Sequence, residues 1–233
     1  MIENENLLNN IKTRISVKED PFPFFFVNDF LPEEIVKKAE EEFIKFSNLK
    51  KAGNERYQKT KLVFNKFNLS NLEPDWDLVG GGMHQSFNGG FLKVHSDFIY
   101  KRKSKQKRVI NLLLYLNSNW KEEWKGSIEL WDSQVKNKKF SAAPLLNNVV
   151  AFRTDFESNH GFPDPVQCPT NESRKSIALY YYIKEKSILP LTIKKRKYFH
   201  AIWKSRPNIH EPTFSDQDSF LKRLKNKFFF RLF

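Results

Sequence analysis

The sequence is poor in the features that mark secreted and membrane-spanning proteins. Its 233 residues contain a single cysteine, Cys168, so an internal disulfide cannot form. No apolar run approaches the ~18 residues that a membrane span requires. The first residues, MIENENLLNNIK, are too polar to resemble a signal peptide. We therefore expect a cytoplasmic protein that owes nothing to a disulfide framework.

The chain is rich in hydrophobic residues, and its charge is unevenly distributed along the sequence. Hydrophobic residues make up 39% of it, with 23 phenylalanines, which is enough for a substantial core and argues against disorder. The net charge is +13, but residues 184–233 carry thirteen Lys or Arg against four Asp or Glu, and so account for +9 of it. The basic character thus belongs mainly to the C-terminal part of the chain.

The pattern of residues 1–77 predicts a region of helix and strand that supports the core, and no functional site is predicted in it. Residues 31–46 have the pattern of a helix whose core face consists of Ile35, Ala39, Phe43 and Phe46, with Glu33 and Glu34 in its first turn. The proline-punctuated apolar segment 21–30 precedes it and is typical of a strand. We expect both segments to cover a sheet.

Residues 78–185 consist of short β-branched and aromatic runs bounded by Gly, Asn, Pro or Asp. Such runs without long intervening helices predict an antiparallel sandwich or jelly roll. Asn88-Gly89-Gly90 predicts a tight turn between two of these strands. The glycines at 80–82 do not form a phosphate loop, because neither Gly-Lys-Ser/Thr nor a helix pattern follows them.

Residues 186–233 form a basic extension with an amphipathic end. Within residues 214–233 the apolar side chains recur at helical spacing among lysines and arginines. This pattern fits a helix that lies on an anionic membrane surface, or one that docks on the body of the protein. We consider nucleic acid an unlikely partner, because the positive charge is concentrated in this tail and away from the predicted pocket.

The stretch FLKVHSDFIY, residues 91–100, places His95 and Asp97 two apart, so that in a strand both project from one face. His160 follows a later strand and can meet them if the two strands face each other in a closed sandwich. Two imidazoles and one carboxylate on one side of a metal form the facial arrangement of non-haem Fe(II) oxygenases. A zinc site with these ligands is also chemically possible.

A cation follows His160 in a strand that is otherwise apolar and aromatic. Arg174 and Ser176 share one face of RKSIALYYY, and an inward guanidinium there requires an anion. Its planar fork matches a carboxylate. Tyr115 reaches the same region if Asn111, Leu113 and Tyr115 face inward. A metal triad beside an Arg and a Tyr suits a cosubstrate with a chelating keto-acid end and a distal carboxylate, which is the shape of 2-oxoglutarate.

The ordered set GGFLKVHSDF, NLLLYLNSNWKEEWKGSIELWD, FESNHGFPDPV and RKSIALYYY resembles the 2-oxoglutarate and Fe(II)-dependent dioxygenases of the prolyl 4-hydroxylase-like group. The resemblance covers roughly residues 21–183. It implies a mainly β fold with flanking helices and a double-stranded β-helix core, in which iron is held by His95, Asp97 and His160. It also implies that Arg174 and Tyr115 hold the distal carboxylate, assisted by Ser176. Asn111 and Gln85 are weaker candidates for the keto-acid end or the substrate.

The resemblance further implies a hydroxylase that uses Fe(II), 2-oxoglutarate and O2, with ascorbate as a possible reductant. Each turnover would convert 2-oxoglutarate to succinate and CO2. The first expectation for the acceptor is a peptidyl proline, and a sugar, lipid or polysaccharide precursor competes with it. The alternative is a non-catalytic basic binding module on a degenerate oxygenase fold, which would require a broken triad or a lost Arg174.

Overall fold

The computed structural model describes residues 9–45, 50–51, 58–64, 75, 78, 80–101, 106–183, 199–207 and 209. The predicted amphipathic segment 214–233 lies outside the described residues. The elements are β1 (Phe24–Val27), α2 (Glu33–Lys45), β2 (Lys50–Lys51), β3 (Gln58–Phe64), β4 (Gly82–Ser96), β5 (Lys107–Tyr115), the 3-10 turn Glu122–Trp124, β6 (Ile128–Trp131), β7 (Lys138–Ala142), β8 (Val149–Arg153), β9 (Asn159–Phe162), β10 (Arg174–Ile183) and β11 (Ile202–Trp203).

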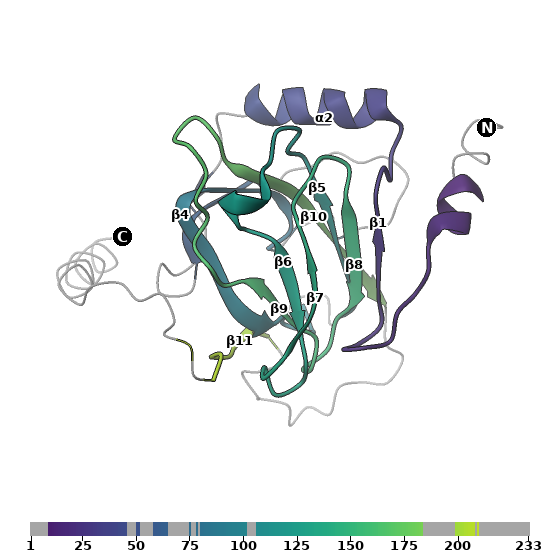
Figure 1. Cartoon of the computed structure of the whole chain (residues 1–233). Helices are drawn as coiled ribbons and strands as arrows, with labels where there is room; N and C mark the ends of the chain where they lie inside the picture. Colours follow the sequence, from purple (N-terminus) through teal and green to yellow (C-terminus); the bar gives the residue numbers. More distant parts are fainter. Residues whose placement is uncertain are drawn as a thin grey trace, which may run out of the picture.

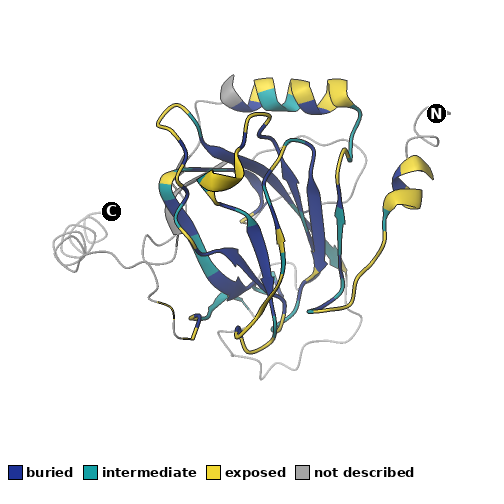
Figure 2. Ribbon diagram, in the orientation of Figure 1, coloured by how far each residue is buried: buried dark blue, intermediate teal, exposed yellow. Residues whose placement is uncertain are grey.

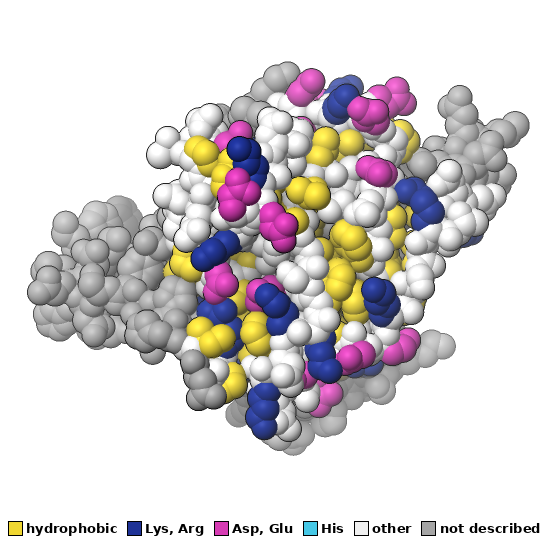
Figure 3. All heavy atoms as spheres, in the orientation of Figure 1, with side chains coloured by type: hydrophobic (Ala, Val, Ile, Leu, Met, Phe, Trp, Pro, Cys, Tyr) yellow, Lys and Arg dark blue, Asp and Glu magenta, His cyan; other side chains and the backbone are white. Residues whose placement is uncertain are grey.

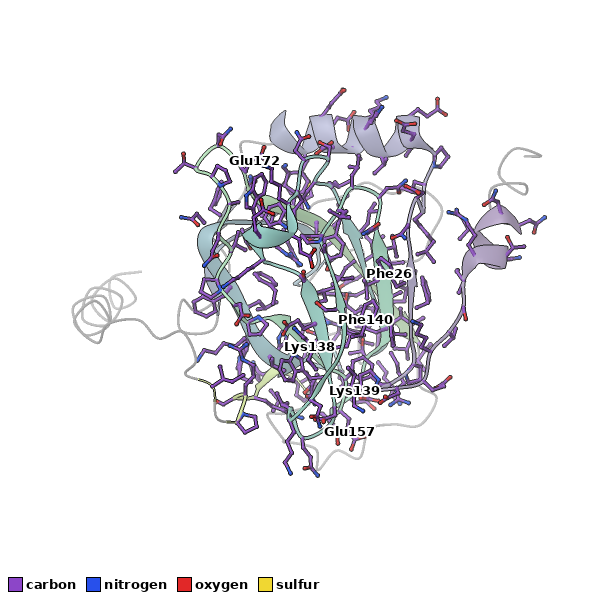
Figure 4. All side chains as sticks on the ribbon, in the orientation of Figure 1. Phe26, Lys138, Lys139, Phe140, Glu157 and Glu172 are labelled. Carbon is purple, nitrogen blue, oxygen red and sulfur yellow. The ribbon has the colours of Figure 1, made fainter. Side chains whose placement is uncertain are left out.

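The strands form one antiparallel sheet that curls on itself, in the order β1-β8-β5-β10-β4-β9-β6-β7 (Figure 1). Its two end strands meet through aromatic side chains. The ring of Phe140 in β7 lies 4.7 Å from that of Phe24 and 5.7 Å from that of Phe26 in β1, and Figure 4 shows Phe26 and Phe140 side by side. This curled sheet is the jelly-roll core that the sequence predicted.

The central strands bury their two faces against different partners. One face fills the inside of the curled sheet with Phe24, Leu113, Tyr115, Phe152 and other apolar side chains. The opposite face of β4, β5 and β10 packs beneath α2, and Figure 2 shows these strands largely buried while α2 is exposed along much of its length. Since successive strand residues alternate between these layers, a side chain's position in its strand decides whether it can reach the interior.

The helix α2 was predicted in the right place but with its core face one residue off. Val36 and Phe43 are buried against Met83 and Leu114, with Ala39 packed beside them. Ile35, which the pattern assigned to this face, is 48% exposed. Val36, Ala39 and Phe43 are spaced three and four apart, so they form an equally good helical stripe.

The predicted turn at Asn88-Gly89-Gly90 is wrong, because these residues lie inside the single long strand β4. They form a bulge instead, in which β4 uses residues 86 to 91 where its neighbour β3 uses only residues 61 to 59. Gly89 has a φ of +75°, and its N–H donates to the carbonyl of Val166. The bulge bends β4 so that one strand lines both halves of the curled sheet.

The surface of the described part carries mixed charge. On the face shown in Figure 3, Lys and Arg side chains are interspersed with Asp and Glu. None of the described helices is both long and apolar enough to cross a membrane.

Candidate metal centre

His95 and His160 lie directly opposite each other in the ladder between β4 and β9. Asp97 follows just beyond the end of β4. One ligand atom from each of the three side chains lies within 4.8 Å of the others, and all three residues are buried. The structure therefore brings together the three residues that the sequence proposed as metal ligands.

Both imidazoles are oriented for coordination by backbone carbonyls. His95 Nδ1 lies 2.9 Å from the carbonyl oxygen of Lys93, and His160 Nδ1 lies 2.9 Å from that of Ser158. Because a carbonyl oxygen only accepts, each Nδ1 must carry the proton, which leaves a lone pair on each Nε2. The two Nε2 atoms point to Asp97, at 3.6 and 3.7 Å from its oxygens.

The protonation states suit a metal as well. Burial, helped by the neighbouring His95, lowers the pKa of His160 to about 4, so its ring is neutral near pH 7. Burial alone would raise the pKa of Asp97, but the positive charge of Arg108 and the two histidines together hold it well below its usual value. The centre thus offers a neutral His160 imidazole and an ionised Asp97 carboxylate, which are the forms of these groups that bind a divalent cation.

Arg108 is the site residue that the sequence analysis missed. Its side chain is fully buried, with Nη1 3.0 Å from Asp97 Oδ2. The guanidinium lies over the rings of Tyr180 and Phe98, at 3.6 and 3.8 Å from their centroids. Val109 is left unpaired between the partners of Tyr181 and Tyr182, and this bulge turns Arg108 to the interior. A period-two pattern from Tyr115 and Asn111 would have placed Arg108 outside.

Asn111 lies beside Asp97 in the interior. Its amide nitrogen donates to Asp97 Oδ2 at 3.0 Å, beside Arg108. It therefore supports a proposed metal ligand, and a contact to the keto-acid end or to the substrate stays a prediction. Arg108 and Asn111 both occupy Oδ2, so Oδ1 is the carboxylate oxygen left for the metal.

Arg174 and Tyr115 meet in the interior as predicted. Arg174 Nη2 donates to the Tyr115 hydroxyl at 3.2 Å, and its Nε donates to the carbonyl of Gly126 at 2.6 Å. Burial lowers the pKa of Arg174 and raises that of Tyr115. Within the described part of the chain, Arg174 forms no ion pair with a carboxylate. A buried guanidinium in this state is a ready anion site.

The position of Arg174 relative to the triad follows from β9. Its guanidinium lies 4.2 Å from the ring centroid of Phe162, and Phe162 shares a face with His160, two residues before it. Two residues of strand span roughly 7 Å, which matches the length of a five-carbon diacid. Ser176 is buried opposite Tyr115 in the ladder, and so lies on the same face.

Gln85 is the predicted residue that the structure does not bring to the site. Its neighbour Ser86 lies opposite Arg174 in the ladder and shares that face, so Gln85 points to the other one. There its amide donates to Ser173 Oγ at 2.9 Å, and it lines a cavity of about 410 Å³ beneath α2. The resemblance alone had named Gln85, and the register of β4 shifts both between Ser86 and Phe91 and between Leu92 and His95, so alternation counted from His95 does not fix the face of Gln85.

Fold and site together define a jelly-roll oxygenase with a facial triad of two histidines and one aspartate. Residues 82–182 match the family model of the 2OG-Fe(II) oxygenase superfamily. Together with the fold and the triad, this match identifies a 2-oxoglutarate- and Fe(II)-dependent dioxygenase that is similar to the prolyl 4-hydroxylases.

Solved structures agree on the fold. A prolyl-4-hydroxylase of Pseudomonas putida is 16% identical, with a TM-score of 0.52 over 69% of this chain and 92% of that one. A prolyl hydroxylase of Trichoplax adhaerens, in complex with a hypoxia inducible factor oxygen degradation domain peptide, is 15% identical, with a TM-score of 0.50 over 76% of this chain and 87% of that one. No curated protein matches the sequence closely enough to count as a relative.

Proposed function

We propose that this dioxygenase hydroxylates a C–H bond of an acceptor molecule, with His95, Asp97 and His160 as the iron ligands. Arg174 and Tyr115 hold the distal carboxylate of 2-oxoglutarate, and Ser176 assists them. The observation that carries this proposal is the buried Arg174, which has a tyrosine and a carbonyl oxygen around it but no carboxylate partner in the described part of the chain. Burying a cation in this way is costly unless an anion joins it.

Some of the interior residues hold the metal and the cosubstrate, and others exclude water. The triad occupies one side of the metal and leaves the opposite side for the keto-acid end and for dioxygen. When bound, the iron supplies the oxidative chemistry that couples 2-oxoglutarate decarboxylation, to succinate and CO2, to oxidation of the acceptor. Leu113, Phe152 and Ile128, all buried in the interior, keep water from the space between the triad and Arg174.

For the acceptor we propose a peptidyl proline. The support is the likeness of the fold to two prolyl hydroxylases. A sugar, lipid or polysaccharide precursor is the competing class, since a fold hosts many substrates. The test is succinate formation from 2-oxoglutarate by wild-type protein with Fe(II), ascorbate and O2, with and without poly-L-proline. Stimulation by poly-L-proline supports the proline acceptor. Succinate that forms without any stimulation contradicts that acceptor and leaves the competing class.

We further propose that residues 214–233 contact an anionic membrane surface. The support is sequence alone: apolar residues at helical spacing, including Leu221 and Leu224, among basic ones. Sedimentation with phosphatidylserine vesicles should fall in an L221D/L224D double variant. Asn226→Asp, which adds a negative charge beside the apolar stripe, should fall much less. Unchanged sedimentation of the double variant would contradict the membrane contact.

A further inference from the structure

The C-terminal extension returns to the metal centre. Strand β11 pairs with the end of β4, with Trp203 opposite His95 and Ile202 opposite Ser96. This pairing lies beyond residue 182, where the match to the oxygenase family ends. The sequence had placed the whole extension away from the pocket, and these residues correct that expectation.

Trp203 lies on the same face of the sheet as the proposed ligand. Residues directly opposite in an antiparallel pair share a face, and His95 has such a partner on each side: His160 in β9 and Trp203 in β11. The indole ring centroid is 4.7 Å from that of His95, with 33° between the planes. His160 has a matching support in Phe152, at 4.5 Å.

Each imidazole is therefore fixed twice, by a carbonyl at Nδ1 and by an aromatic ring at its face. The carbonyl sets the direction of the Nε2 lone pair but leaves the ring free to tilt about the hydrogen bond. The aromatic ring limits this tilt by packing. Among the described residues, the ring of His95 contacts those of His160, its fellow ligand, and Trp203, which belongs to the extension.

The chain that follows Trp203 is tied to the core by Lys204 and Arg206. The backbone N–H of Lys204 donates to the carbonyl of Val94 at 2.8 Å, and its ammonium donates to that of Ser133 at 3.2 Å. Arg206, which is buried, lies 2.8 Å from Asp164. Because these contacts join three separate parts of the core, the position of the indole is fixed.

We propose that Trp203 is a positioning residue of the metal centre, and that the catalytic unit therefore extends through residue 207. This inference rests on the proposed assignment of His95, Asp97 and His160 as iron ligands. Its consequence is that the extension sets the geometry of His95 in addition to carrying charge.

The first test measures proximity. Quenching of indole fluorescence by Co(II), a redox-stable stand-in for Fe(II), is compared in wild type, Trp203→Phe and Trp124→Phe. Trp124 is also half-buried but packs in a separate cluster with Trp120. A large part of the quenching should disappear in Trp203→Phe and persist in Trp124→Phe. Equal quenching in all three proteins would overturn the proposal.

The second test measures positioning. Anaerobic Fe(II) binding should weaken about tenfold in Trp203→Ala and recover in Trp203→Phe, which restores a ring. Trp124→Ala serves as the control for loss of an indole and should bind Fe(II) as wild type does. Unchanged Fe(II) affinity in Trp203→Ala overturns the role of Trp203. Absence of Fe(II) binding in wild type instead overturns the ligand assignment beneath it. If Trp203→Ala does not fold, the Phe variant still decides through the quenching test.

Discussion

At the scale of single residues, the proposed 2-oxoglutarate site depends most on the buried guanidinium of Arg174, which has no carboxylate partner in the described part of the chain. Arg174→Met removes the guanidinium but keeps the length of the side chain. Loss of a buried charge pair at ~2–5 kcal/mol predicts roughly 30- to 3000-fold weaker 2-oxoglutarate binding. Fe(II) binding should persist, because Arg174 touches none of the triad. Calorimetric titration of both ligands measures this. The control is Arg153→Met, which removes an exposed arginine paired to Asp155.

In the metal-free protein, the positive charge of Arg108 neutralises the carboxylate of Asp97. Replacement of Arg108 therefore gives a separate prediction. Arg108→Met leaves the buried Asp97 carboxylate without its arginine partner, with Asn111 and the two histidines beside it, and should destabilise the metal-free protein by ~3–5 kcal/mol. A bound divalent cation supplies the missing positive charge. Denaturant unfolding with and without Co(II) should therefore show a larger metal-dependent gain in the variant than in wild type. An equal gain would mean that Arg108 does not serve Asp97.

These residues also show how far sequence reasoning extends. The pairing of His95 with Asp97, and of Arg174 with Ser176, was predicted from the two-residue period of a strand. Arg108 was missed, and Gln85 points to the other face, because β5 and β4 contain bulges that a regular alternation does not anticipate. A single extra residue reverses the alternation, and nothing in the local sequence distinguishes Val109 as the unpaired one.

At the scale of elements, the turn after the 3-10 segment determines where Arg174 can lie. Gly126 has a φ of +75°, and a Cβ there would lie 3.1 Å from Arg174 Cδ. Gly89 has the same φ, but a Cβ there would meet no atom within 4 Å. Gly126→Ala and Gly89→Ala therefore share one backbone penalty and differ in the contacts that the added Cβ makes with Arg174, Val166 and Trp120.

We predict that Gly126→Ala weakens 2-oxoglutarate binding by roughly tenfold, because a tightened contact displaces the guanidinium from its position. Gly89→Ala should bind 2-oxoglutarate like wild type, while both lose a similar ~1 kcal/mol of stability. Thermal unfolding and 2-oxoglutarate titration separate the two effects. Equal 2-oxoglutarate affinity in the two variants would contradict the role given to this turn.

The elements themselves were only partly predictable. The helix at 31–46 and the strands from 78 onward follow from apolar periodicity and turn residues. The periodicity left the face of α2 ambiguous, since Ile35 and Val36 both complete an apolar stripe with Ala39 and Phe43. The return of β11 to β4 was not predictable, because a two-residue strand is too short to show a pattern.

At the scale of the whole molecule, the triad connects β4 and β9, so metal binding should stabilise the fold. Metal at a hundredfold excess over its Kd adds about 2.7 kcal/mol, or ~5–10 °C for a chain of this size. Anaerobic melting with Fe(II) should show this rise in wild type. His160→Ala, which removes one ligand, should show almost none. A full rise in His160→Ala would place the stabilising metal elsewhere.

The most direct test of the proposed metal and 2-oxoglutarate site is an anaerobic titration of the metal-free protein with Fe(II) and then with 2-oxoglutarate, followed by visible absorption. The account predicts a new metal-to-ligand charge-transfer band in wild type, which requires the keto acid to chelate a metal held at the triad. The same titration of His160→Ala and Asp97→Ala should give no band. A wild-type protein that binds Fe(II) but develops no band with 2-oxoglutarate would contradict the central claim.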